Sequence, residues 1–507
     1  MSEFYPKLGK KSIVAGLLAS AAFLVHSDAV LAKIPNDPYY SLQESFYNQI
    51  GAPQAWEYTT GGSDVVVAVI DTGVDINHED LKNNIWRNPK EIFGNAIDDD
   101  ANGFIDDING WNFVEHNNDV SISAILESND SGAVNHGTIL AGLIGAEGDN
   151  SALGTGLNWS AKIMPLRAIG SNGDGVLADV ARAVNYAVDN GAHIISISFV
   201  GASTYPELTD SLFRAYKKGV LVVVSAGNSR NDSSGNENLT KVKQYPICLD
   251  SDSSENWILG VGSVDHKDQL SIFGDYGSCI DISAPGERIF STQKFAPQYG
   301  YTKNFDGAWS GTSFSAPLVA GSAALIKSIR PDWSAKEIMA NLLHSAEDVD
   351  GLNPGFAGQM GYGRLNVGKA VAIAFTSKNA PPPPPVVWTS KLISNKKTNM
   401  VQVATDGKVL REFPLTNYSP KFSRWVMKDD LFVYARFEKN KIIVDAWDLV
   451  GNKKLSNFVL VGLSSLSDLK IENLWGYDPN AVLFVKKGKV NQKIIIDIAS
   501  KSWKAEE

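Results

Sequence analysis

Apolar runs rich in β-branched residues recur at intervals along the first half of the chain. Unbroken runs of this kind are typical of strands that are covered on both faces. Segments with helical patterns separate them, and strands that alternate with helices predict a parallel sheet with helices on both faces. The expected strands are 64–70, 163–168, 193–199, 220–225 and 257–264, and the expected helices are 175–190, 206–218, a segment after Ser313, and 334–346.

The fold class predicted by this pattern is α/β. In open parallel sheets the working site lies outside the carboxyl ends of the strands. The stretch 34–63 before the first strand is rich in turn-forming residues. Ser334 with Glu337 three residues later predicts a capping box at the start of the last helix.

A different organisation follows Pro381–Pro385, five consecutive prolines. Such a run forms a semi-rigid spacer, although a ligand for a proline-binding module is the alternative. Short alternating runs beyond it predict a small antiparallel β domain. The predicted divisions are a main domain over 33–375, a linker over 376–386 and a β-rich accessory domain over 387–507.

The N-terminus has the features of a targeting segment. Lys7, Lys10 and Lys11 precede an apolar run, and small residues lead up to Ala32. These features predict a secretory signal over 1–32, and the run is short for the alternative, a membrane anchor. We therefore expect an exported protein, secreted or held in the periplasm or cell envelope, with no stable membrane span after cleavage.

Charge is unevenly distributed over the 507 residues, whose formal net charge is −10. Residues 386–507 hold 20 Lys and Arg against 13 Asp and Glu, and the remainder is strongly acidic. An acidic main domain argues against nucleic acid as a partner. The basic C-terminal part could attract anionic surface polymers, although a solvated surface is the simpler explanation. The chain has 2 cysteines, Cys248 and Cys279, which exclude a disulfide framework and leave open whether they pair.

One candidate for chemistry is Ser313, in Gly311-Thr-Ser-Phe-Ser-Ala-Pro317, which runs into an apolar segment rich in small residues. Pro317 is expected in the first turn of a helix. Ser313 would then lie at the helix N-terminus, where free N–H groups and the helix dipole favour a developing anion. A plain N-cap is the more common role for such a serine.

Three other residues stand at comparable places. Asp71 ends the first predicted strand, with Asp75 as a competing carboxylate; His136 opens a small-residue helical segment; Asn228 follows the fourth strand. Each also has an ordinary structural reading as a turn former, cap or core residue. None of the chain's 7 histidines forms the helical His pair that a zinc protease needs.

Together the four residues follow the order Asp71, His136, Asn228, Ser313. In these motifs, residues 36–372 resemble the catalytic domain of the subtilisin-like serine proteases, the subtilases. The resemblance implies a serine endopeptidase acting on proteins or peptides, with Ser313 as nucleophile, His136 as base, Asp71 orienting it, and Asn228 in the oxyanion hole. It also places the substrate-binding edge at Ser198, Phe199, Val200 and Gly201, where Val200 would narrow the pocket for the residue before the cut.

A second motif is the acidic stretch 98–107. Alternating carboxylate and amide residues with Gly103 at the sixth place copy the first half of a calcium loop. We therefore expect a structural Ca²⁺, with an acidic solvated loop as the alternative. The expected ligands are Asp98, Asp100, Asn102, Asp106 and Asp107.

A competing reading makes the chain a non-catalytic binding protein with the subtilase fold, in which the C-terminal β domain has the main role. The resemblance also leads us to look for a pro-domain. Only a short stretch separates Ala32 from the first strand, so we expect folding assistance and latency to come from elsewhere, such as the C-terminal part.

Overall fold

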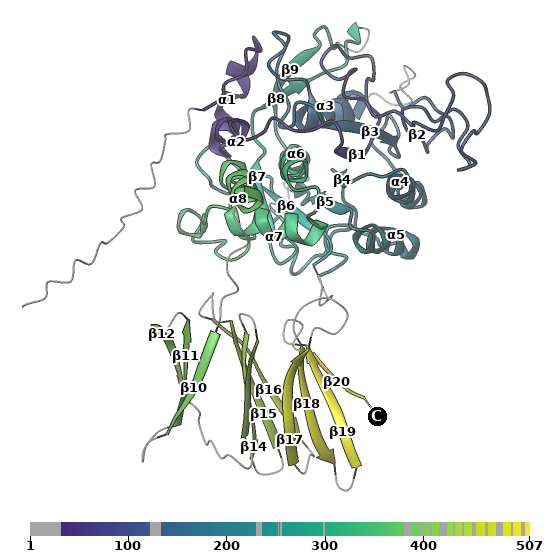
Figure 1. The fold of residues 1–507 in the computed structure, drawn as a ribbon. Coiled ribbons are helices and arrows are strands. Elements are labelled where there is room, and N and C mark those ends of the chain that lie inside the picture. The colour runs from purple at the N-terminus through teal and green to yellow at the C-terminus, as the bar shows by residue number, and fades with distance from the viewer. Residues whose placement is uncertain are drawn as a thin grey trace, which may run out of the picture.

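The computed structural model describes residues 32–121, 133–229, 236–251, 253, 256–297 and 300–379, together with the strands between 388 and 506. Within them, a parallel sheet has the strand order β2-β3-β1-β4-β5-β6-β7 (Figure 1). The prediction of a parallel sheet is confirmed. Its strands are β1 Val66–Asp71, β2 Trp111–Asn112, β3 Lys162–Arg167, β4 Ile194–Ile197, β5 Leu221–Ser225, β6 Leu259–Val264 and β7 Ile282–Pro285.

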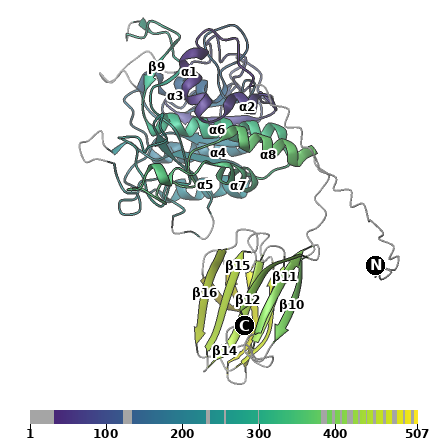
Figure 2. The ribbon, with the colours of Figure 1, turned by 90° about the vertical axis from the view of Figure 1, so that its left-hand side faces the viewer.

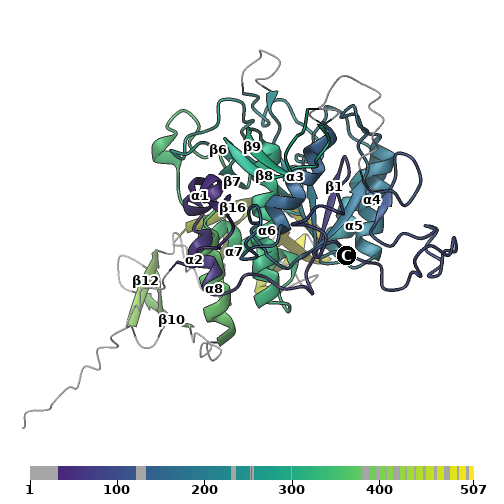
Figure 3. The same cartoon turned by 90° about the horizontal axis from the view of Figure 1, so that it is seen from above.

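Helices cover both faces of this sheet, as the sequence predicts. Alternate residues of β5 enter opposite cores: Leu221 and Val223 pack with α3 and α6, whereas Val222 and Val224 pack with α4 and α5. Figure 3 shows α4 and α5 together on one side of the molecule, with α1, α2 and α8 on the other. The helices are α1 Tyr40–Gln49, α2 Ala52–Trp56, α3 Ala133–Gly145, α4 Leu177–Asp189, α5 Pro206–Lys217, α6 Thr312–Ile329, α7 Ala335–Ser345 and α8 Val367–Asn379.

Helix α6 is buried along nearly its whole length and lies alongside α8 (Figure 2). Its small residues allow this burial. A Cβ added to Gly321 would lie 3.0 Å from the Leu157 side chain and 3.4 Å from the Ile144 carbonyl oxygen. A hairpin of β8 Ile289–Thr292 and β9 Phe305–Trp309 leads into this helix and packs on α3. The N-terminus of α6 is therefore held from several sides.

Two short helices, α1 and α2, occupy the stretch that the sequence analysis read as turns. Gly51, with φ +72°, separates them. Polar residues interrupt the helical pattern in the sequence, but the helices bury an aromatic face that includes Tyr40, Tyr47 and Trp56. Short helices depend on tertiary packing more than on local propensity, so the local sequence was a poor guide here. At α7 the predicted capping box between Ser334 and Glu337 is present.

The two cysteines, whose pairing the sequence left open, form a disulfide, Cys248–Cys279, across 31 residues. It joins the segments that precede β6 and β7 and lies within the core on the α4 and α5 side. The bond therefore ties together two of the connections at one end of the sheet.

Residues 388–506 contain antiparallel strands in three further sheets, of order β10-β11-β12, β13-β14-β15-β16 and β17-β18-β19-β20. The division into domains stays a prediction. Helix α8 extends to Asn379, into the predicted linker. The remainder of that linker and almost all of the predicted signal lie outside the described residues. In the described part of the chain, no helix has the length and apolar character to cross a membrane. The strands are β10 Trp388–Ser394, β11 Asn399–Thr405, β12 Lys408–Pro414, β13 Ser423–Lys428, β14 Leu431–Glu438, β15 Lys441–Asp448, β16 Lys453–Val461, β17 Ser465–Glu472, β18 Asn480–Lys487, β19 Val490–Asp497 and β20 Ser502–Glu506.

Candidate active site

Asp71 and His136 meet at the carboxyl end of β1, an interior strand of the sheet. His136 lies in the first turn of α3, and its Nδ1 donates to Asp71 Oδ1 at 2.8 Å and Oδ2 at 3.0 Å. Because a carboxylate only accepts hydrogen bonds, Nδ1 carries the proton and Nε2 is the nitrogen available as a base. The strand order changes direction at β1, which lies between β3 and β4. The pair therefore occupies a topological switch point of the sheet.

The carboxylate of Asp71 is buried, with 2% of its surface exposed, whereas the His136 side chain is 25% exposed. Thr72, which the sequence analysis did not single out, donates to Asp71 Oδ1 from its N–H at 2.8 Å and its Oγ1 at 3.2 Å. These bonds hold the buried charge in one orientation. Burial lowers the pKa of His136, but the charge of Asp71 and the hydrogen bond to it raise that pKa, and the net result lies above the ordinary value.

The helix carrying His136 reaches the end of β1 because two glycines meet there. A Cβ added to Gly137 would lie 2.2 Å from the Gly73 carbonyl oxygen and 3.2 Å from Asp71 Oδ1. Gly73 has φ +109°, a conformation that favours glycine. The N–H of Gly137 donates to Thr72 Oγ1 at 3.2 Å. The distance between imidazole and carboxylate therefore depends on the absence of side chains at both glycines.

Ser313 is the second residue of α6, which confirms its predicted place at a helix N-terminus. The prediction for Pro317 is wrong, because α6 begins at Thr312 and Pro317 lies in its second turn. Proline has no N–H to donate to the carbonyl four residues earlier, and that carbonyl belongs to Ser313. Ser198 Oγ donates to it instead, at 3.0 Å.

The hydroxyl of Ser313 makes the reciprocal contact, donating to the Ser198 carbonyl oxygen at 3.1 Å. In this rotamer Ser313 Oγ points to the end of β4. Among the described residues, the imidazole of His136 makes its hydrogen bonds to Asp71 alone. The structure thus shows an oriented imidazole and a serine turned toward the predicted substrate edge.

Asn228 follows β5 and is fixed by the first residue of α6. Its Oδ1 accepts from Thr312 N–H at 2.9 Å and Thr312 Oγ1 at 3.1 Å. Because the amide atom that faces these two donors must be the acceptor Oδ1, the remaining amide atom is Nδ2. In the described part of the chain Nδ2 has no hydrogen-bond partner. A Cβ on Gly311 would lie 3.4 Å from this Nδ2. The backbone N–H of Ser313 is likewise unpaired among the described residues, so two donors remain at this end of α6.

The predicted substrate edge directly follows β4. Phe199 and Val200 pack against the core on the α4 and α5 side, and Val200 Cγ2 would lie 3.0 Å from a Cβ on Gly227. The N–H and carbonyl of Gly201 are both bonded to Tyr245, at 2.8 Å each. An added strand would therefore have to use the backbone of Ser198 to Val200.

A cavity of about 280 Å³ adjoins His136 on the side of the β8–β9 hairpin. The His136 ring lies 6.0 Å from the ring of Phe314, so the residue after Ser313 forms part of its wall. The cavity is lined by Asn135, His136, Ile139, Gln293, Tyr301, Trp309, Ser310 and Phe314.

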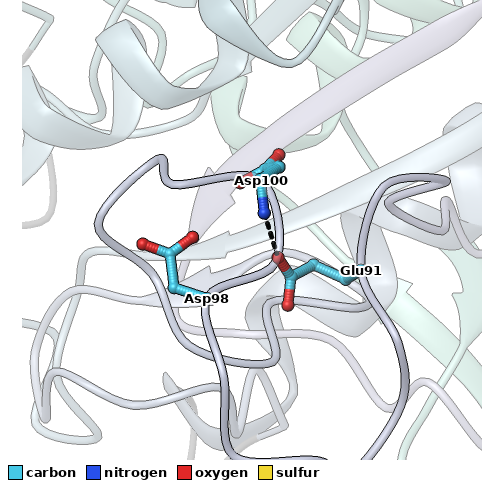
Figure 4. A group of neighbouring side chains, drawn as sticks. All are labelled: Glu91, Asp98 and Asp100. Atoms are coloured by element: carbon cyan, nitrogen blue, oxygen red, sulfur yellow. Dashed lines mark hydrogen bonds between the residues drawn. The ribbon is translucent and has the colours of Figure 1, made fainter.

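The acidic loop brings only part of the predicted calcium set together. Asp98 and Asp100 form a cluster with Glu91, in which carboxylate oxygens lie within 4.8 Å of one another (Figure 4). Asp106 turns away and accepts from the N–H groups of residues 94–96. Asp107 accepts from the Asn88 and Asn102 amides and from the Tyr186 hydroxyl.

Glu91 was missed because it lies outside the motif. Its Oε1 accepts from the Asp100 N–H at 3.2 Å (Figure 4), and its Oε2 is buried with no hydrogen-bond partner in the described part of the chain. Asn102 takes part through its N–H, which donates to Asp98 at 3.0 Å and Asp100 at 3.2 Å, while its Oδ1 accepts from Phe104. Only the fold of the loop shows which carboxylates converge.

An imidazole oriented by a buried carboxylate, with a serine and an amide at a helix N-terminus nearby, is the set of groups that serine hydrolases use. The model of the subtilase family matches residues 62–363, and the chain belongs to that family.

The chain is similar to several proteases. It is 32% identical to thermitase of Thermoactinomyces vulgaris over 66% of this chain and 99% of thermitase. It is 34% identical to the major intracellular serine protease of Bacillus subtilis (strain 168), over 59% of this chain and 82% of that protein. A solved structure of the proteases from Pseudoalteromonas arctica PAMC 21717 aligns with a TM-score of 0.54 at 26% identity, covering 68% of this chain and 100% of that one.

Proposed function

We propose that the chain is an exported serine endopeptidase that cuts peptide bonds through Asp71, His136 and Ser313 and an acyl-enzyme intermediate. The observation that carries the proposal is the pair of hydrogen bonds from His136 Nδ1 to Asp71. They leave Nε2 as the base, in a chain whose relatives include proteins named as a serine proteinase and a serine protease.

The first step requires Ser313 Oγ to leave the Ser198 carbonyl. A rotation about χ1 exchanges one staggered rotamer for another, and it would turn the hydroxyl toward His136 Nε2. That nitrogen takes the proton while Oγ attacks the peptide carbonyl. Asp71 stabilises the imidazolium that forms.

The tetrahedral oxyanion would be met by Asn228 Nδ2 and the Ser313 N–H, two donors beside the start of α6 that have no partner among the described residues. Preorganised donors of this kind lower the barrier because they need no rearrangement as charge develops. His136 then gives its proton to the leaving amine, which departs as the C–N bond breaks. A water molecule, deprotonated by the same nitrogen, then hydrolyses the ester bond of the acyl-enzyme and releases Ser313 Oγ.

Hydrolysis of a peptide library by the purified protein tests this proposal, with Ser313→Ala as the variant. Ser322→Ala is the matched control, since Ser322 lies on the same helix and its Oγ donates to the Leu318 carbonyl. We expect activity in the wild type and the control and loss in Ser313→Ala. No hydrolysis by a folded wild type would favour the rival, a non-catalytic protein whose C-terminal part has the main role.

The same library tests the pocket before the cut. Val200 Cγ2 would lie 3.0 Å from a Cβ added to Gly227, which precedes Asn228, so we infer a preference for small or medium side chains there. A clear preference for Phe or Tyr would contradict it, and Val200→Gly should widen the accepted set.

We propose a structural Ca²⁺ held by Glu91, Asp98 and Asp100. Ca²⁺ takes oxygen ligands, and a buried Glu91 oxygen that has no partner among the described residues, beside two further carboxylates, fits a cation. On the chelator-treated protein, added Ca²⁺ should raise the melting temperature, and Glu91→Gln should reduce that rise. Asp99→Asn is the control, because Asp99 accepts from Ile92 and Asn95 in the same loop. An equal effect of the two variants, or no effect of Ca²⁺ on the wild type, would refute the site.

Export is proposed from the predicted signal and is supported by the Cys248–Cys279 disulfide, since such bonds persist in oxidising compartments. The N-terminal residue of the mature protein tests it, and Lys33 is expected. For the basic residues 387–507 we propose binding to anionic surface polymers. Deleting the chain from Pro381 onward should then abolish that binding while leaving peptide hydrolysis unchanged.

A further inference from the structure

Asp275, in the connection between β6 and β7, forms hydrogen bonds to the turn that contains Asn228. The residue is buried, with 1% of its surface exposed. Its N–H donates to the Gly227 carbonyl at 3.2 Å. Its Oδ1 accepts from the Ser229 N–H at 3.2 Å, and its Oδ2 accepts from Ser229 Oγ at 2.8 Å. The residues on either side of Asn228 are therefore both bonded to Asp275.

The contact is close as well as polar. A Cβ added to Gly227 would lie 2.6 Å from Asp275 Oδ2 and 3.0 Å from Val200 Cγ2, and Gly227 has φ +111°. The turn thus fits between the end of β4 and the carboxylate. Asp275 is itself anchored, because Oδ1 also accepts from the Glu237 N–H at 2.9 Å.

On the opposite side, the amide of Asn228 is held by Thr312, which bonds its Oδ1. With Oδ1 held at α6 and the backbone held at Asp275, the direction of Nδ2 follows from these two attachments. Removing either one frees the amide to shift. No hydrogen bond joins Asp275 to the Asn228 side chain in the described part of the chain, so any influence must pass through the backbone of the turn.

We propose that Asp275 is a positioning residue for oxyanion stabilisation, which acts by fixing the turn 227–229 and thereby the direction of Asn228 Nδ2. This rests on the proposed peptidase function. Oxyanion donors work over a narrow range of distances, and a misplacement of about 1 Å in an active site can cost about 100-fold in rate. The carboxylate accepts from three donors, the Ser229 N–H, Ser229 Oγ and the Glu237 N–H, which offset a charge that would otherwise oppose the oxyanion.

A double-mutant cycle tests the proposal, with kcat and KM measured on a chromogenic peptide for wild type, Asp275→Ala, Asn228→Ala and the double variant. We expect Asp275→Ala to lower kcat at least tenfold with little change in KM. In the Asn228→Ala background the same change should have little further effect, because the group it positions is gone. Asp275→Asn, which keeps an acceptor for the Ser229 N–H, should recover most of kcat.

Asp250→Ala is the matched control. Its carboxylate also caps a turn, accepting from the Trp257 and Ile258 N–H groups at 2.8 Å each, away from the site. We expect a lower melting temperature and an unchanged kcat. If Asp275→Ala does not fold, Ser229→Ala, which removes the 2.8 Å bond from the other partner, takes its place in the cycle.

Equal losses of kcat in the two backgrounds would overturn the positioning role, since they would mean that Asp275 acts independently of Asn228. A loss expressed in KM alone would overturn it as well. Absence of hydrolysis by folded wild type would instead refute the proposed peptidase function, so the two failures are distinguishable.

Discussion

Gly137→Ala is the substitution that best tests how the central pair is held. The new Cβ would lie 2.2 Å from the Gly73 carbonyl oxygen. Gly73 cannot easily yield, because its φ is +109° and the next residue, Val74, donates to the Val120 carbonyl at 3.0 Å. Helix α3 must therefore move away from β1, and it carries His136 with it.

The geometry sets the size of the effect. Ordinary contact at such a Cβ begins near 3.4 Å, so the helix must move by about 1 Å, a displacement that can cost about 100-fold in rate. The bonds from His136 Nδ1 to Asp71, now 2.8 and 3.0 Å, would lengthen accordingly. Alanine favours a helix over glycine by about 1 kcal/mol, which offsets part of the strain in the measured stability. The variant should therefore lose much of its kcat/KM while its melting temperature changes little.

The assay is kcat/KM on a peptide substrate together with thermal unfolding. Gly351→Ala is the control, because no atom of the described residues lies within 4 Å of a Cβ added there, and both properties should stay close to wild type. A Gly137→Ala variant that keeps its activity within about threefold would refute the reasoning, since 1 Å of misplacement is expected to cost far more.

Three further outcomes follow from the same structure. Asp71→Asn removes the charge that raises the pKa of His136 against burial, so the acid limb of the kcat/KM profile should move to lower pH while kcat falls by about 10⁴; an unmoved limb would contradict this. Burial raises the pKa of Asp281 from 3.8 to about 7, so the stability present below pH ~4 is lost as pH rises to ~7, and Asp281→Asn should flatten the fall in melting temperature over that range. Parallel curves would show that Asp281 is not responsible. Ser198→Ala leaves the Ser313 carbonyl without its donor and should cost about 1–3 kcal/mol of unfolding free energy by denaturant titration, a value near zero showing that another donor replaces it.

Much of the sheet could be predicted because buried parallel strands are nearly continuous apolar runs. The run ending at Ile70 corresponds to β1, extended by one residue to Asp71, and the run 220–225 corresponds to β5. The convergence of Asp71 and Asn228 at one edge follows from the parallel direction of their strands. By contrast, α1 and α2 depend on aromatic contacts with distant segments, which no local pattern shows.

Within the site, the candidate catalytic residues could be predicted from the sequence. The hydrogen bonds that orient their side chains could not. Thr312 and Asp275 hold the turn of Asn228 through bonds between segments far apart in the sequence, whereas Thr72 bonds the adjacent Asp71. Such partners are ordinary polar residues in sequence and become distinctive only when the fold brings them together. The place of Pro317 within the helix was not predictable: the sequence put it in the first turn, whereas α6 begins at Thr312 and holds Pro317 in its second turn, where Ser198 Oγ donates to the Ser313 carbonyl in place of the missing N–H.

The central claim is that Ser313 is a nucleophile activated by His136. Its most direct test is labelling with a fluorophosphonate, followed by mass spectrometry of the digested protein. The account predicts one adduct, on Ser313, formed by wild type and lost or strongly slowed in His136→Ala although the serine is still present. An adduct on another residue, or undiminished labelling of Ser313 without His136, would contradict it.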